Sequence, residues 1–138
     1  MKTILRISGI FQVLVGAGIW GIWILSYSKG SIPELQSEPY RIAMHLLAEA
    51  FTGFLLLLSG LVILLTGTKH HILFHVAMGT LLYTLIASPG YFAQHGQWSV
   101  VGLFLGMLVL TVAIILYQGR DLTIRVSDEN KINYENKG

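Results

Sequence analysis

Long stretches without Asp, Glu, Lys or Arg divide the chain. These side chains are absent from residues 7–28 and 70–119, and residues 42–68 contain only one, Glu49. A helix needs about 20 apolar residues to cross a hydrocarbon core, so the last stretch is long enough for two crossings. Open sheet edges are not viable in lipid, which leaves helices as the spanning elements. The pattern therefore predicts an all-α integral membrane protein with helices at about 4–27, 41–66, 71–88 and 98–118.

The connections between these segments predict how the helices follow one another. Residues 67–70 are too few for anything but a tight turn, so the second and third helices are expected to be antiparallel neighbours. Pro89 should end or kink the third helix. We expect an antiparallel four-helix bundle within residues 1–119, followed by a polar, weakly ordered tail at 120–138.

The distribution of basic residues predicts the orientation in the membrane. One side receives five of them and the other side two: Lys2, Arg6, Lys69, Arg120 and Arg125 against Lys29 and Arg41. The positive-inside rule then places both termini in the cytoplasm, and the loops at 28–40 and 90–97 outside. The first hydrophobic run is too long for the core of a signal peptide and is predicted to be a membrane helix. We expect a multi-pass protein of the cytoplasmic membrane.

Composition narrows the function classes. Of the 138 residues, 54% are hydrophobic and only 12% are charged, about half the charged fraction of a soluble domain. The formal net charge of +2 is too small and too dispersed to indicate nucleic-acid binding. The chain contains no cysteine, which excludes disulfides, thiolate catalysis and iron–sulfur ligation.

Polar residues recur on one face of two helices. In the second helix, four polar residues and one leucine recur every three or four positions: His45, Glu49, Thr52, Leu56 and Ser59. The third helix has a comparable series: His71, His75, Gly79, Tyr83 and Ile86. A polar stripe in a bilayer is expected to face protein rather than lipid, so both stripes are predicted to point inward.

Glu49 is the most informative position. A carboxylate about two turns inside a membrane helix costs several kcal/mol unless it is paired, hydrated or protonated. We expect it to lie in an outward-facing polar pocket whose candidate ligand-binding residues come from three helices and a loop: Trp23, His45, Glu49, Tyr83, Ser88, Tyr91 and His95. The alternatives are a hydrogen-bonded cluster that only sets helix register, or half of a metal site completed by His95, Glu34 or Glu38.

A second polar cluster is predicted at the cytoplasmic end, with four candidate members: Gln12, His71, His75 and Tyr117. Two histidines one turn apart can chelate a metal or ligate a haem. A membrane haem requires histidines on two helices at equal depth, however, and His45 and His75 belong to opposite ends. The sequence therefore leaves metal and cofactor unknown.

Part of the chain resembles a known family. Arg6, Gly9, Phe11, Gly16 and Gly18 are followed by Glu49, Gly53, residues 55–60 (LLLLSG) and Lys69. This half of the chain is similar to the small four-helix DoxX-like membrane proteins, which include subunits of quinone-linked oxidoreductase complexes. The basic residue frequent near the end of their first helix is replaced by Trp20 and Trp23. The resemblance implies a four-helix fold, and fold analogy does not carry function.

The sequence leaves three classes of function open. The first is a ligand-binding or accessory subunit whose pocket takes a small lipophilic molecule such as a quinone, lipid or sterol. The second is a small oligomeric transporter or channel, associating through Gly102 and Gly106, with Glu49 as a protonatable relay. The third is a purely structural or assembly protein. No nucleotide-binding, zinc-protease or nucleophile–base motif is present, so an autonomous enzyme is the least supported class.

Overall fold

The described part of the chain is helical. The computed structural model describes residues 2–30, 32, 34–68, 70–94 and 96–135, and its elements are α1 (Lys2–Ser28), α2 (Glu34–Ser37), α3 (Pro39–Thr66), α4 (His71–Ala87), α5 (Pro89–Gln94) and α6 (Trp98–Glu135). Four helical segments are long and apolar enough to cross a membrane: Thr3–Ser28, Pro39–Thr66, His71–Gln94 and Trp98–Gln118. This confirms the prediction of an all-α chain with four helices long and apolar enough to span a membrane.

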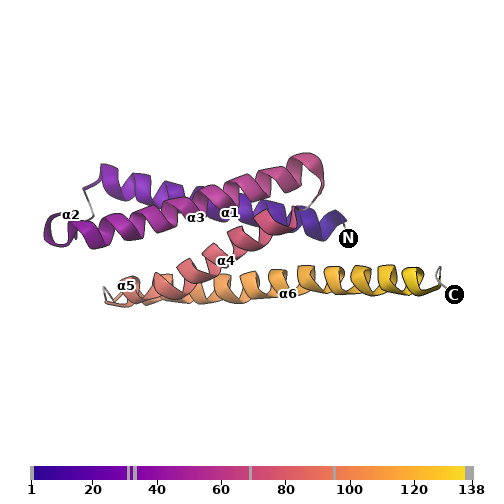
Figure 1. The fold of residues 1–138 in the computed structure, drawn as a ribbon. Coiled ribbons are helices and arrows are strands. Elements are labelled where there is room, and N and C mark those ends of the chain that lie inside the picture. The colour runs from indigo at the N-terminus through magenta and orange to yellow at the C-terminus, as the bar shows by residue number, and fades with distance from the viewer. Residues whose placement is uncertain (1, 31, 33, 69, 95, 136–138) are drawn as a thin grey trace. The chain divides into compact units, whose positions relative to one another are not determined.

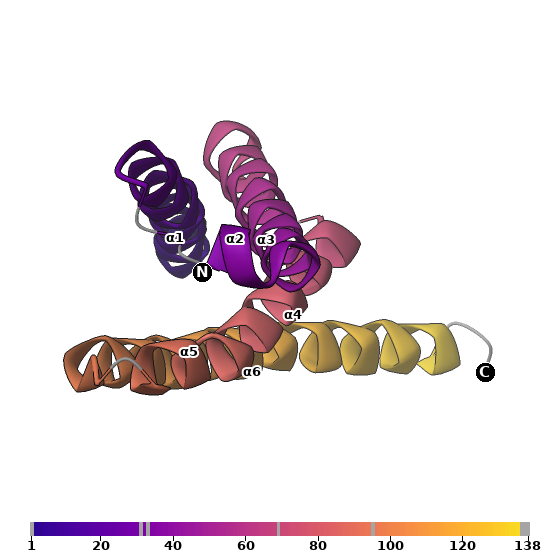
Figure 2. The same ribbon diagram turned by 90° about the vertical axis from the view of Figure 1, so that its left-hand side faces the viewer.

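The chain divides into two compact units, residues 1–88 and 89–138. In the first unit α1 lies antiparallel to α3, and α4 turns back from the end of α3 (Figures 1 and 2). In the second unit α5 packs on α6, where the rings of Phe92 and Phe104 are 5.4 Å apart. The antiparallel neighbours expected within the first unit are present, whereas the complete four-helix bundle and its orientation in the membrane stay predictions.

Local sequence explains where the helices begin and end. Proline occupies the first turn of α3, where its missing N–H costs nothing. Gly67 ends the same helix in the left-handed conformation (φ 66°), and its N–H donates to the carbonyl of Ile63 at 2.9 Å. Pro89 follows the end of α4 and opens α5, as its restricted backbone predicts.

The last helix is longer than predicted. We expected it to end near Gln118, with a weakly ordered tail, but α6 continues to Glu135. Residues 120–135 contain neither proline nor glycine, so nothing in the backbone stops the helix, and their polarity alone made the tail look unstructured.

The contact between α1 and α3 depends on glycines. A Cβ atom added at Gly16 would lie 2.8 Å from the carbonyl oxygen of Gly53, and one at Gly60 would lie 2.7 Å from that of Gly9. Both pairs bring backbone against backbone, which only residues without a side chain permit. Because each helix repeats its glycine after seven residues, the two contacts lie on one seam.

The polar stripe of α3 is buried, and that of α4 is not. Four of its five members are buried as predicted, Glu49, Thr52, Leu56 and Ser59, whereas His45 is half-buried. The stripe predicted to point inward from α4 is instead exposed throughout: His71, His75, Gly79, Tyr83 and Ile86. The buried face of α4 carries Phe74, Ala77, Met78, Leu81, Thr84 and Leu85. The prediction for α4 was wrong because the helix is apolar on every side, so a few polar positions do not identify its packed face.

Replacing Gly16 by alanine should destabilise the first unit by about 1–3 kcal/mol, because the methyl group would meet a backbone carbonyl that cannot rotate away. Gly18→Ala is the matched control on the same helix, since a Cβ atom there has nothing within 4 Å. The control should be neutral or slightly stabilising. The measurement is the unfolding midpoint of each variant in detergent, and equal midpoints for the two variants would contradict the close contact.

Candidate functional site

A single carboxylate gathers side chains from the three long helices of the first unit. Glu49 lies about three turns into α3 and is only 8% exposed. The indole N–H of Trp23 on α1 donates to its Oε2, and the hydroxyl of Ser88 at the end of α4 donates to its Oε1 at 2.5 Å. His45, one turn earlier on α3, places Nε2 3.2 Å from Oε1. We call Trp23, His45, Glu49 and Ser88 the carboxylate cluster.

In the carboxylate cluster, Glu49 accepts the hydrogen bonds and its neighbours donate them. An ionised carboxylate only accepts hydrogen bonds, with about four acceptor positions, and three neighbours occupy most of them. His45 must then carry its proton on Nε2. The Trp23 ring meets the His45 ring edge to face, with centroids 5.9 Å apart, which limits rotation of the imidazole. The arrangement satisfies a buried carboxylate and holds it in one position.

Two hydroxyls continue the polar contact between α3 and α4. Thr84 donates to the hydroxyl of Thr52 at 3.4 Å, and Thr52 donates to the carbonyl of Ala48 at 2.9 Å. Ser88 and Thr84 are one turn apart, as are Ala48 and Thr52. The polar residues of α4 that meet α3 are therefore those at its C-terminal end.

A pocket of about 250 Å³ opens beside the carboxylate cluster. Its lining comes entirely from α3 and the end of α4: Arg41, Met44, His45, Ala48, Glu49, Tyr83, Thr84, Ala87 and Ser88. Arg41 pairs with Glu38, with Nη1 2.7 Å from the carboxylate oxygen, and its side chain is 71% exposed. The pocket thus has a charged, open end at Arg41 and a closed, polar end at Glu49 and Ser88.

The structure brings together only part of the predicted pocket. His45, Glu49, Tyr83 and Ser88 line the cavity as expected. Trp23 was expected among the ligand-binding residues, but it bonds directly to Glu49 and does not line the cavity.

Two other predicted members of the pocket, Tyr91 and His95, stay predictions. Tyr91 belongs to α5 in the second unit, where its ring meets Phe92 edge to face at 5.4 Å. His95 lies outside the described residues.

The sequence did not identify the apolar lining of the pocket. Met44, Ala48 and Ala87 looked like ordinary membrane-helix residues. Their spacing could have identified two of them. Met44 and Ala48 are four residues apart and directly precede His45 and Glu49, so they lie on a neighbouring face of the helix.

Two of the four members of the second predicted cluster contact each other. His71 and His75 stack at 6.4 Å, and Nδ1 of His75 lies 2.6 Å from the carbonyl of His71. Gln12 is fully buried, and both its amide atoms lack a hydrogen-bond partner in the described part of the chain. Tyr117 lies on α6 in the second unit. Within the described ranges, no three His, Cys, Asp or Glu side chains group as metal ligands would.

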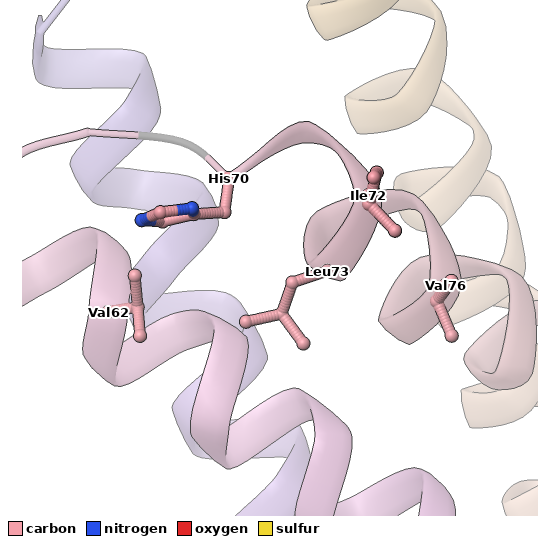
Figure 3. A pocket seen from close by; sticks show the side chains of 5 residues that line it. All are labelled: Val62, His70, Ile72, Leu73 and Val76. Carbon is pink, nitrogen blue, oxygen red and sulfur yellow. The ribbon is translucent and has the colours of Figure 1, made fainter.

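A larger cavity of about 450 Å³ lies at the other end of α3. Figure 3 shows its lining of Val62, His70, Ile72, Leu73 and Val76, with the His70 ring above Val62. Val62 is 13 residues beyond Glu49, or about 20 Å along the helix. His70 is the one polar side chain in this lining, so the cavity offers little to orient a ligand.

Comparison with known proteins adds a family but no activity. Residues 2–130 match the family described as a domain of unknown function, DUF8058. The chain belongs to the DUF8058 family. No curated protein and no solved structure matches this DUF8058 chain. The resemblance to DoxX-like proteins therefore stays a prediction.

Removing one donor from the carboxylate cluster should destabilise the first unit. Ser88→Ala and Trp23→Phe each leave an oxygen of Glu49 short of a partner, at a cost of about 1–3 kcal/mol. The matched controls are Ser28→Ala, whose hydroxyl bonds only a backbone carbonyl near an exposed helix end, and Trp98→Phe at an exposed indole. Unfolding midpoints in detergent provide the measurement, and cluster variants no worse than their controls would contradict these hydrogen bonds.

Proposed function

We propose that this protein is a multi-pass membrane protein whose first unit binds a small amphiphilic molecule in the pocket beside Glu49. One observation carries the proposal: a cavity of about 250 Å³ borders a buried carboxylate that donors from three helices hold in place. Binding sites commonly combine apolar walls with a few polar groups held in fixed positions. The pocket has both.

The size of the pocket limits the occupant. Drug-sized ligands fill sites of about 300–1,000 Å³, so this cavity holds a head group or a single ring rather than a whole lipid. The remainder of an amphiphile would extend past the exposed side chains of Met44 and Tyr83 into the surrounding bilayer. A quinone, a lipid or a sterol-like molecule meets this description.

The proposed biological role is that of an accessory subunit. A pocket without a nucleophile–base pair binds rather than transforms its occupant. The DoxX-like resemblance favours a partner complex that handles quinones or lipids. The cytoplasmic membrane is the proposed location, with the pocket facing outward.

A second candidate function rests on His45. Its side chain is 33% exposed and contacts the nearly buried Glu49, so it joins an enclosed carboxylate to an open pocket. Such a pair can pass protons, as acidic and histidine chains do in transporters. An oligomeric transporter using Glu49 as a relay is therefore the alternative.

Native mass spectrometry of the full chain released in mild detergent tests the binding function. The wild type should carry a stoichiometric amphiphile adduct, and Glu49→Gln should retain it at least about tenfold less, since the amide alters the charge and hydrogen bonds that define the closed end. Glu135→Gln, at the end of α6, is the matched control and should retain the adduct.

The other outcomes separate the alternatives. A bare polypeptide in all three proteins would overturn the binding proposal. Glu49-dependent proton flux into liposomes by that bare polypeptide would favour the relay. A lower unfolding midpoint in Glu49→Gln, without an adduct or flux in any protein, would indicate a purely structural cluster.

The outward orientation of the pocket has its own test. Because the chain lacks cysteine, single substitutions report accessibility against a clean background. Ser37→Cys should react with a membrane-impermeant maleimide on intact cells, and Thr68→Cys should react only after lysis. Both positions are exposed, so their reactivity reports the side of the membrane. The reverse pattern would place the pocket at the cytoplasmic face.

A further inference from the structure

We infer that the occupant of this pocket carries an anionic head group, a carboxylate or phosphate, bound between Arg41 and His45. The inference rests on the proposed binding function and specifies its ligand. It is carried by the arrangement of charges along one face of α3, where Glu38, Arg41, His45 and Glu49 follow one another at spacings of three and four residues.

The closed end of the pocket does not suit a cation. Glu49 is the one carboxylate in the lining, and its oxygens already face Trp23, His45 and Ser88. An ammonium group would have to replace one of these donors, leaving a buried N–H or O–H without a partner. The carboxylate is thus engaged in holding the helices and is not available to a cationic ligand.

The open end of the pocket offers unused donors. Arg41 has five N–H groups in a planar fork, and the ion pair to Glu38 involves Nη1. An exposed pair of this kind is worth about 0–1 kcal/mol, so a better-placed anion can share or displace it. A guanidinium binds carboxylate and phosphate through two parallel hydrogen bonds, which a neutral head group cannot match.

His45 completes the anion site one turn further into the helix. Its Nε2 faces Glu49, which leaves Nδ1 for an occupant of the same pocket. A doubly protonated imidazole donates at both nitrogens, so His45 in that form donates to Glu49 and to the head group together. Arg41 and His45 then bind the head group from the same helix face, and His45 links that group to Glu49.

The rest of the lining requires the anion to be part of an amphiphile. Met44, Ala48 and Ala87 are apolar and offer nothing to a fully hydrated ion. Met44 and Tyr83 are 69% and 66% exposed, so the side of the pocket that they form opens along the helix surface, where an acyl chain can lie. A fatty acid and an anionic phospholipid share this chemistry.

Native mass spectrometry with defined lipids tests the inference. The delipidated full chain is offered dioleoylphosphatidylglycerol and, separately, oleate. Equimolar dioleoylglycerol, which has no phosphate, is the uncharged reference lipid, and we expect at least one of the two anions to be retained about tenfold or more over it. Arg41→Gln should lose that preference. Arg41→Lys should retain part of it, because an ammonium group keeps the positive charge but lacks the two parallel donors of the guanidinium. Arg6→Gln, an exposed arginine of α1, is the matched control and should behave as the wild type.

Each outcome bears on the inference. Retention of phosphatidylglycerol alone identifies a phosphate head group, and retention of oleate alone identifies a carboxylate. Equal retention of dioleoylglycerol, or an equal loss in Arg6→Gln and Arg41→Gln, would overturn the inference. If a neutral co-purified adduct still depends on Glu49, the binding function stands and only the anionic head group is refuted. No adduct with any added lipid, together with no co-purified adduct on the wild type, would refute both.

Discussion

The placement of a carboxylate inside an apolar helix constrains everything around it. Glu49 is costly within a hydrocarbon layer unless donors surround it, and those donors come from α1, α3 and the end of α4. Because each donor must reach the same two oxygens, the three helices have little freedom to slide or rotate. The pocket lies beside this cluster, between α3 and the end of α4.

The close glycine contacts between α1 and α3 allow Trp23 to reach Glu49. Gly9 meets Gly60 and Gly16 meets Gly53, which brings the backbones of α1 and α3 into contact. Trp23 follows Gly16 by seven residues and so continues the same face. Side chains of a helix lean toward its N-terminus, so the Trp23 indole is directed back along α1 to the level of Glu49. A wider helix separation would leave the indole short of the carboxylate.

The same contacts connect architecture to the proposed chemistry. A carboxylate held by three donors is a fixed feature of the pocket wall, which suits recognition of a ligand more than movement of protons. His45 is the member with access to both the cluster and the cavity. In the proposed function, His45 links occupancy of the pocket to the packing of α1, α3 and α4, and the accessory subunit reports a bound amphiphile to a partner in this way. Membership of the DUF8058 family adds no activity to this picture.

The sequence alone determined the helices and the importance of Glu49. Stretches without charged side chains located four helices long and apolar enough to span a membrane. They did so because burying a charge in lipid is costly, and this cost depends on the residues of each segment alone. The stripe from Glu49 to Ser59 was also predictable, since a buried polar face on a membrane helix must find protein partners. Only the tertiary structure showed that Trp23 bonds to Glu49, that the polar stripe of α4 is exposed, and that Met44 and Ala87 line the pocket. Apolar residues suit lipid and protein equally, so the face on which α4 packs depends on contacts between helices rather than on the pattern within one.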